Sequence, residues 1–79
     1  MNNIKNIGSI IRFHRKKAGL TQKQLATLAG VGKSAVFDIE KGKNSVRLNT
    51  LMAILAVLNI QLRPESPMMN HFKNKENQV

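Results

Sequence analysis

Residues 20–42 read LTQKQLATLAGVGKSAVFDIEKG, and this stretch is the most informative part of the chain about its architecture. It opens with a capping box, in which Thr21 and Gln24 satisfy each other's backbone N–H groups at the first turn of a helix. The pattern predicts a short helix that stops at Gly30. Its inward face is expected to comprise Leu25, Ala26, Leu28 and Ala29.

A second short helix follows after a tight connection. Gly30 and Gly32 lie two residues apart, and glycine permits the positive φ and the close approach that such a turn needs. The next helix is predicted at residues 33–41, with Val36 and Ile39 as its apolar anchors. Two short helices joined by a glycine-containing turn form a helix-turn-helix.

The sequence on both sides of this pair predicts a small all-α domain. Residues 4–18 and 48–58 repeat apolar residues at helical spacing, which indicates a first and a fourth helix. Their stripes comprise Ile4, Ile7, Ile10, Ile11 and Ala18, and then Leu48, Leu51, Met52, Leu55 and Leu58. Residues 60–63 alternate apolar and polar, which predicts a short strand. The expected architecture is a bundle of four to five helices with this C-terminal strand, spanning residues 1–64, and a disordered polar tail at 65–79.

The charge balance favours a polyanionic partner. The chain has 13 Lys and Arg against 4 acids, a formal net charge of +9. All four acids lie beyond residue 37: Asp38, Glu40, Glu65 and Glu76. Such a field attracts nucleic acid through phosphate contacts and counterion release. A solubilising surface is the competing interpretation, but it usually mixes both signs. An anionic membrane surface is a weaker competitor, because no basic face is combined with a Trp-rich or Phe-rich apolar one.

Composition argues against several other classes. The chain has no cysteine, and His14 and His71 lie far apart in sequence, so neither a metal nor another cofactor is expected. It has no glycine-rich phosphate loop and no suggestion of an acid–base dyad, so it is not expected to be an enzyme. No apolar run approaches the roughly 20 residues of a membrane span, and the N-terminus does not resemble a signal peptide. A bacterial cytoplasmic location, associated with the nucleoid, is therefore expected.

The docking geometry of a helix-turn-helix assigns roles to the second helix of the pair, because its N-terminal residues face base edges in the major groove. Lys33 suits guanine, Ser34 suits several bases, and Ala35 suits a thymine methyl. Asp38 suits cytosine N4, or else it is a solvated carboxylate or the partner of a neighbouring lysine. Two aromatic residues, Phe13 and Phe37, are expected to be partly buried against the core. Exposure toward a partner is the less favoured alternative.

Several segments resemble the Cro/C1-type (XRE) helix-turn-helix family: Leu20-Thr21-Gln22, Gln24-Leu25-Ala26, Gly30-Val31, Ile39-Glu40-Lys41-Gly42-Lys43 and Leu48-Asn49-Thr50-Leu51. The resemblance covers about residues 7–60 and implies a lambda-repressor-like bundle. It implies a structural ion pair between Arg15 and Glu40. The expected phosphate-contacting set is Gln22, Lys43, Arg12 and Lys23. The chain departs from the family at Gly32 and Arg47, where a polar helix cap is common.

The stretch Leu58-Asn59-Ile60-Gln61-Leu62-Arg63-Pro64 is similar to the HipB-type antitoxins, in which the fourth helix runs directly into a short strand. A lone strand leaves its backbone groups unpaired, so pairing with a second copy is expected to close a homodimer on a palindromic operator. Its buried centre is expected to comprise Leu55, Leu58, Ile60 and Leu62. The resemblance also implies a HipA-like kinase toxin as a partner. Three function classes remain: a repressor acting alone, an antitoxin that represses and binds a toxin, and a generic basic interaction module.

Overall fold

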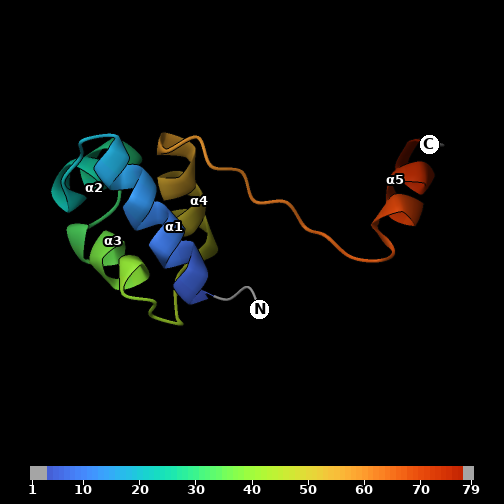
Figure 1. The fold of residues 1–79 in the computed structure, drawn as a ribbon, viewed down its shortest axis with the longest axis horizontal. Coiled ribbons are helices and arrows are strands. Elements are labelled where there is room, and N and C mark those ends of the chain that lie inside the picture. The colour runs from blue at the N-terminus through green and yellow to red at the C-terminus, as the bar shows by residue number, and fades with distance from the viewer. Residues whose placement is uncertain (1–3, 78–79) are drawn as a thin grey trace.

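Five helices are present in the computed structural model, which describes residues 4–77 (Figure 1). They are α1 (Ile4–Lys17), α2 (Gln22–Ala29), α3 (Lys33–Glu40), α4 (Leu48–Val57) and α5 (Met69–Asn77). The first four lie where the sequence predicts helices. Residues 1–3 and 78–79, which the predicted domain and tail include, lie outside the described part of the chain, as does the side chain of Ile4. Among residues 4–77 no helix is long and apolar enough to cross a membrane.

The first four helices pack around one small core. α3 packs against α1 and α2, and α2 packs against α4. The core comprises Ile11 from α1, Leu25 and Ala26 from α2, Val36 and Ile39 from α3, and Leu51, Ile54 and Leu55 from α4. The predicted anchors of α3 are therefore confirmed. A domain of this size buries only a modest core, so each of these residues carries a large share of its stability.

Several residues of the predicted apolar stripes are exposed instead. Leu28 is 62% exposed, Ile10 46%, Leu48 69% and Met52 45%, and Ala18 is exposed as well. Leu28 lies about 110° around α2 from the midpoint of Leu25 and Ala26, which turns its side chain away from the core. On α1 the buried face follows the four-residue spacing from Ile11 to Arg15, and Ile10 lies about 100° to one side of it.

Both ends of α2 have the geometry that the sequence predicts, although Gly32 in the following turn does not adopt a positive φ. The Thr21 hydroxyl accepts from the Gln24 backbone N–H at 3.0 Å, and the Gln24 side-chain oxygen accepts from the Thr21 backbone N–H at 2.8 Å. Gly30 ends α2 in the left-handed region, with φ of 72°. Gly32 and Arg47 begin α3 and α4 without a side-chain cap.

A close helix crossing was not anticipated from the sequence. Gly8 of α1 is buried against the end of α3. A Cβ atom at Gly8 would collide with the backbone carbonyl oxygen of Ile39. Glycine is therefore required here by the distance between the two helices, and this contact sets how closely α1 lies against α3.

The C-terminal part differs from the sequence prediction in two respects. Residues 60–63 are not a strand, and no strand occurs elsewhere in the described residues 4–77. A strand needs a neighbour for its backbone groups, and the described chain places no extended segment beside this one. The predicted disordered tail contains α5, which stands apart from the bundle at the end of an extended linker (Figure 1). The α5 sequence lacks periodicity, but it contains no glycine or proline to break a helix.

Candidate nucleic-acid interface

The outward face of α3 is the centre of the candidate site. Val36 and Ile39 fix the inward side of this helix, since both are buried. An α-helix turns 100° per residue, so the outward face, about 130–170° away, comprises Ser34, Phe37, Asp38 and the following Lys41. Ser34, Phe37 and Lys41 are exposed, and Asp38 is half-buried. Donors, an acceptor and an aromatic ring therefore share one face, which gives it both hydrogen-bonding and apolar groups of the kinds that can contact base edges.

A hollow of about 430 Å³ lies along one flank of α3, and we call it the α1–α3 hollow. It is lined by Arg12, Gln22, Phe37, Glu40 and Lys41. Arg12 and Gln22, two predicted phosphate contacts, are thus brought together from different helices. Lys41, which the sequence analysis did not single out for DNA contact, adds a second cation.

A second hollow, of about 230 Å³, lies along the other flank, between α3 and the loop that leads into α4. Its lining includes Ser34, Ala35, Asp38, Lys43 and Arg47. Lys43 Nζ lies 3.5 Å from Asp38 Oδ2, and the two side chains are 56% and 40% exposed, respectively. Asp38 thus has the neighbouring lysine partner that was one of its three predicted alternatives. Arg47 is a further cation that the sequence analysis considered only as a helix cap.

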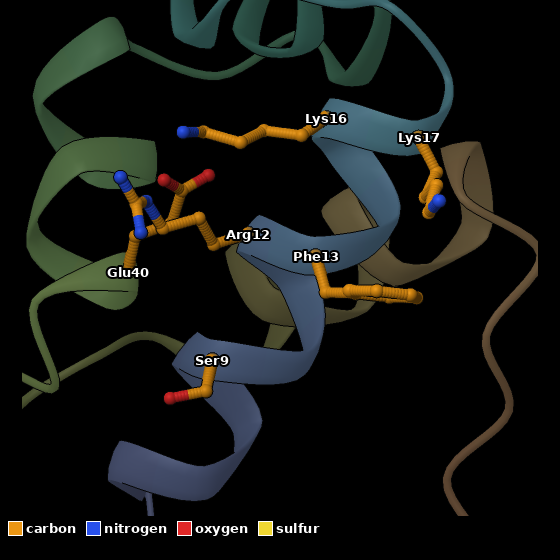
Figure 2. Close-up of a pocket in the computed structure, with 6 residues that line it drawn as sticks. All are labelled: Ser9, Arg12, Phe13, Lys16, Lys17 and Glu40. Atoms are coloured by element: carbon orange, nitrogen blue, oxygen red, sulfur yellow. The ribbon is translucent and has the colours of Figure 1, made fainter.

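Basic side chains from α1 extend the positive surface on the α1–α3 side. Arg12 and Lys16 project from α1 toward the side where Glu40 lies (Figure 2). Phe13 and Lys17 project from the opposite side of the helix, with Lys17 Nζ 5.7 Å from the centre of the Phe13 ring (Figure 2). Two adjacent turns of α1 therefore present cations beside the outward face of α3.

A buried polar network holds the site's elements together. Arg15 donates from Nε to Glu40 Oε2 at 2.6 Å and from a terminal nitrogen to Glu40 Oε1 at 3.0 Å. A further guanidinium nitrogen donates to the carbonyl oxygen of Leu20 at 2.8 Å. The side chains of Arg15 and Glu40 are only 9% and 3% exposed. The ion pair implied by the family resemblance is therefore present, and it ties α1 to α3.

The same carboxylate also orients a predicted phosphate contact. Gln22 Nε2 donates to Glu40 Oε1 at 3.2 Å. The hydrogen bonds that Arg15 donates to Glu40, together with the negative charge of Glu40, raise the pKa of Arg15 above its ordinary value, and burial opposes them only in part. Arg15 therefore stays charged at any physiological pH, and the network does not titrate through this group.

Two of the predicted DNA contacts, Lys33 and Lys23, line neither of the two hollows beside α3. Lys33 begins α3 and is exposed. Lys23 lines a different hollow on the outer side of α2, with Leu20 and Leu28 among its neighbours, so it is not grouped with Arg12 and Gln22. Lys23 follows Gln22 in the sequence, and neighbouring residues on a helix point about 100° apart, which is why the two side chains line different hollows.

The four residues predicted to form the centre of the dimer do not share one surface. Leu55 is 1% exposed and belongs to the domain's own core, so it does not reach a partner's surface. Leu58 and Ile60 pack partly against the same core, and Leu62 is 44% exposed. Only the last three residues retain surface that a second copy could cover.

Comparison with known proteins agrees with this geometry. A helix-turn-helix family model matches residues 11–64. An HTH-type transcriptional regulator of Sinorhizobium fredii is 33% identical over 57 residues, which is 72% of this chain and 75% of that protein. An HTH-type transcriptional regulator of Haemophilus influenzae is 46% identical over 44 residues, 56% of this chain and 45% of its own length.

The immunity repressor protein of Bacillus phage phi105 is 39% identical over 56 residues, 71% of this chain. The chain spans only 39% of that repressor's length. The chain therefore matches only part of the longer phage repressor, whereas it matches most of the Sinorhizobium regulator. Because the family match covers more than half of the sequence, the chain belongs to the Cro/C1-type (XRE) helix-turn-helix family.

Proposed function

We propose that this chain is a sequence-specific transcriptional repressor that places α3 in the major groove of its operator. The observation that carries the proposal is the arrangement around α3: a polar and aromatic outward face with a cation-bearing hollow on each flank. A recognition helix in the major groove has a phosphate backbone on either side of it, so cations on both flanks suit that position. The names of the relatives, two transcriptional regulators and a phage immunity repressor, point the same way.

The residues divide into two functional groups. Lys33, Ser34, Ala35 and Asp38 are assigned to base edges. Phosphate contacts are assigned to Arg12, Gln22, Lys41, Lys43 and Arg47, which line the two hollows. Asp38 and Lys43 pair in the free protein, so DNA binding exchanges this weak exposed pair for contacts to a base and a phosphate. The proposal assigns no catalytic step to the chain, which acts by binding alone.

The first experiment selects duplexes from a random library with the full chain and measures Kd by fluorescence anisotropy at several salt concentrations. Affinity is expected to fall with salt. The logarithm of the association constant should fall linearly with the logarithm of the salt concentration, with a slope of about −0.9 for each phosphate contacted. Lys43→Ala should weaken all duplexes alike and reduce that slope by about 1. Lys33→Ala should instead cost about 1–3 kcal/mol on the selected duplex and relax its specificity.

Lys73→Ala is the matched control for charge, because Lys73 lies on α5, apart from the bundle (Figure 1). It should leave the selected affinity nearly unchanged. A chain that enriches no sequence from the library, or whose affinity does not respond to salt, contradicts the proposed function.

A homodimer is part of the proposal, since helix-turn-helix proteins bind palindromes as two-fold pairs with half-sites about one turn apart. The surface proposed for it follows α4 and comprises Leu58, Ile60 and Leu62. Leu62→Glu places a charge at the exposed end of this surface and should shift the chain toward monomer in sedimentation velocity. Met68→Glu is the control, since Met68 is also exposed but lies just before α5. If the two variants sediment alike, the dimer interface lies elsewhere on the chain.

An antitoxin role is the second candidate. Residues 58–64 resemble HipB-type antitoxins, and the part of the chain beyond the bundle carries exposed apolar side chains: Met68 at 61% and Phe72 at 58%. Such an element suits a protein partner, proposed as a HipA-like kinase, that binds while α3 remains on DNA. Co-expression with the neighbouring open reading frame, followed by co-purification, tests this. A neighbour that neither co-purifies nor is toxic alone leaves a stand-alone repressor.

A further inference from the structure

Phe37 is an exposed aromatic side chain in the middle of the helix assigned to the groove. It is 45% exposed although it lies one residue from the fully buried Val36. Its ring does not belong to the core cluster of the domain. An aromatic ring gains from burial, so a ring left in water on a binding face has free energy to release when a ligand covers it.

The position of Phe37 on α3 is between the two groups of DNA contacts. It lies three residues after Ser34 and next to Asp38, both assigned to bases. Its other side lines the α1–α3 hollow, with Arg12 and Gln22, both assigned to phosphate. A ring in this place therefore meets DNA between the base edges and the backbone.

Lys41 restricts the ring from the C-terminal side. Lys41 Nζ lies 5.0 Å from the centre of the Phe37 ring, within the range of a cation–π interaction. This contact orders both side chains before DNA arrives, so less freedom is lost on binding. The ammonium group remains on the hollow's surface, where a phosphate oxygen can accept from it.

The major groove offers one apolar group on its base edges, the C5-methyl group of thymine. A phenyl ring has no hydrogen bond to offer to the neighbouring donors and acceptors, so it disfavours bases that display only those. We propose that Phe37 determines specificity by packing on a thymine methyl group at the edge of the groove beside Arg12 and Lys41. This inference rests on the proposed function, since it needs α3 in the major groove.

The test removes the methyl group without altering the base pair. In the duplex that the full chain selects from a random library, each thymine is replaced in turn by deoxyuridine, which differs only by the lack of the C5-methyl group. At one position in each half-site the replacement should lower the affinity of the wild-type chain about fourfold, which is the effect of burying one methyl-sized carbon group. The Phe37→Ala chain should lose no affinity when the thymine at that position is replaced by deoxyuridine. Its losses of affinity at the other thymine positions should equal those of the wild-type chain.

Phe13→Ala is a matched control, because Phe13 is an exposed ring with a lysine above it, on the side of α1 that faces away from Glu40 (Figure 2). It should keep the wild-type response at every position. Phe37→Leu keeps an apolar side chain, and it should keep part of the methyl discrimination. This second variant also tests the idea if Phe37→Ala proves unstable in a thermal melt.

The outcomes separate this inference from the proposed function. A Phe37→Ala chain that retains the wild-type penalty at every thymine overturns the inference alone. The inference is also overturned if Phe37→Ala lowers the affinity for selected and random duplexes equally, because the ring would then only position Lys41. A wild-type chain that enriches no sequence overturns the proposed function, and this inference with it.

Discussion

Removing Glu40 should cost this domain a large share of its stability. Glu40→Ala leaves the Arg15 guanidinium, in a side chain that is 9% exposed, with the Leu20 carbonyl oxygen as its remaining partner. Breaking a buried ion pair by removing one member costs about 3–5 kcal/mol, because the other charge stays buried and uncompensated. Natural domains have about 0.05–0.15 kcal/mol of stability per residue, so a chain of 79 residues has roughly 4–12 kcal/mol in total.

Urea unfolding followed by far-ultraviolet circular dichroism gives the measurement, since the chain has no tryptophan or tyrosine to report by fluorescence. Arg15→Met, Glu40→Leu and the double variant Arg15→Met/Glu40→Leu form a mutant cycle with the unaltered chain. The double variant should be more stable than either single one, because it removes both charges and fills their space with apolar groups.

The exposed pair of Asp38 and Lys43 provides the control. Its side chains are 40% and 56% exposed, and the atoms lie 3.5 Å apart. Lys43→Ala should therefore change the free energy of unfolding by less than about 1 kcal/mol. If Glu40→Ala costs no more than Lys43→Ala, and the cycle for Arg15 and Glu40 gives no coupling, then the argument from burial is refuted.

Three further predictions concern the fold. Gly8→Ala should lower the free energy of unfolding by about 1–3 kcal/mol, because the new Cβ meets the rigid Ile39 carbonyl, and an unchanged urea midpoint would mean that α1 and α3 separate freely. Thr21→Ala removes half of the capping box and should cost about 1 kcal/mol by the same assay, whereas no loss would show that Gln24 alone suffices. Leu25→Ala should cost about 2–5 kcal/mol, but Leu28→Ala should stay within about 0.5 kcal/mol, and equal losses would contradict their assignment to opposite environments.

The sequence predicts the first four helices well, and the boundaries of α2 depend on local chemistry. Thr21, Gln24 and Gly30 act on backbone groups a few residues away, so both ends of α2 follow from the sequence. The helix α5, which no such signal marks, was not predicted. Burial within a helix of two turns is harder to predict. Leu25 and Leu28 are the same residue type three positions apart, and only the location of the neighbouring helices distinguishes them.

The site could be predicted where it depends on α3 alone and not where it depends on packing. Ser34 and Asp38 follow from the position of α3 and its first turn. The grouping of Arg12 and Gln22 with Lys41 requires the crossing of α1, α2 and α3, which no local pattern encodes. The Gly8 contact belongs to the same crossing, and it was missed for the same reason. The exposure of Phe37 was the less favoured alternative, because an aromatic residue beside a core valine is more often buried.

Glu40 connects the stability of the fold to the geometry of DNA contact. Its carboxylate accepts from Arg15 of α1 and from Gln22 at the start of α2, while its own backbone belongs to the end of α3. One buried acid thus fixes the distance between a side chain that we propose contacts phosphate and the helix that we propose faces the bases. A phosphate contact of Gln22 and a base contact of Ser34 can form together only if that distance matches the DNA. The acid lies within a strongly basic chain, yet it supports binding to a polyanion, because its charge is used internally by Arg15 and its effect on DNA is one of position.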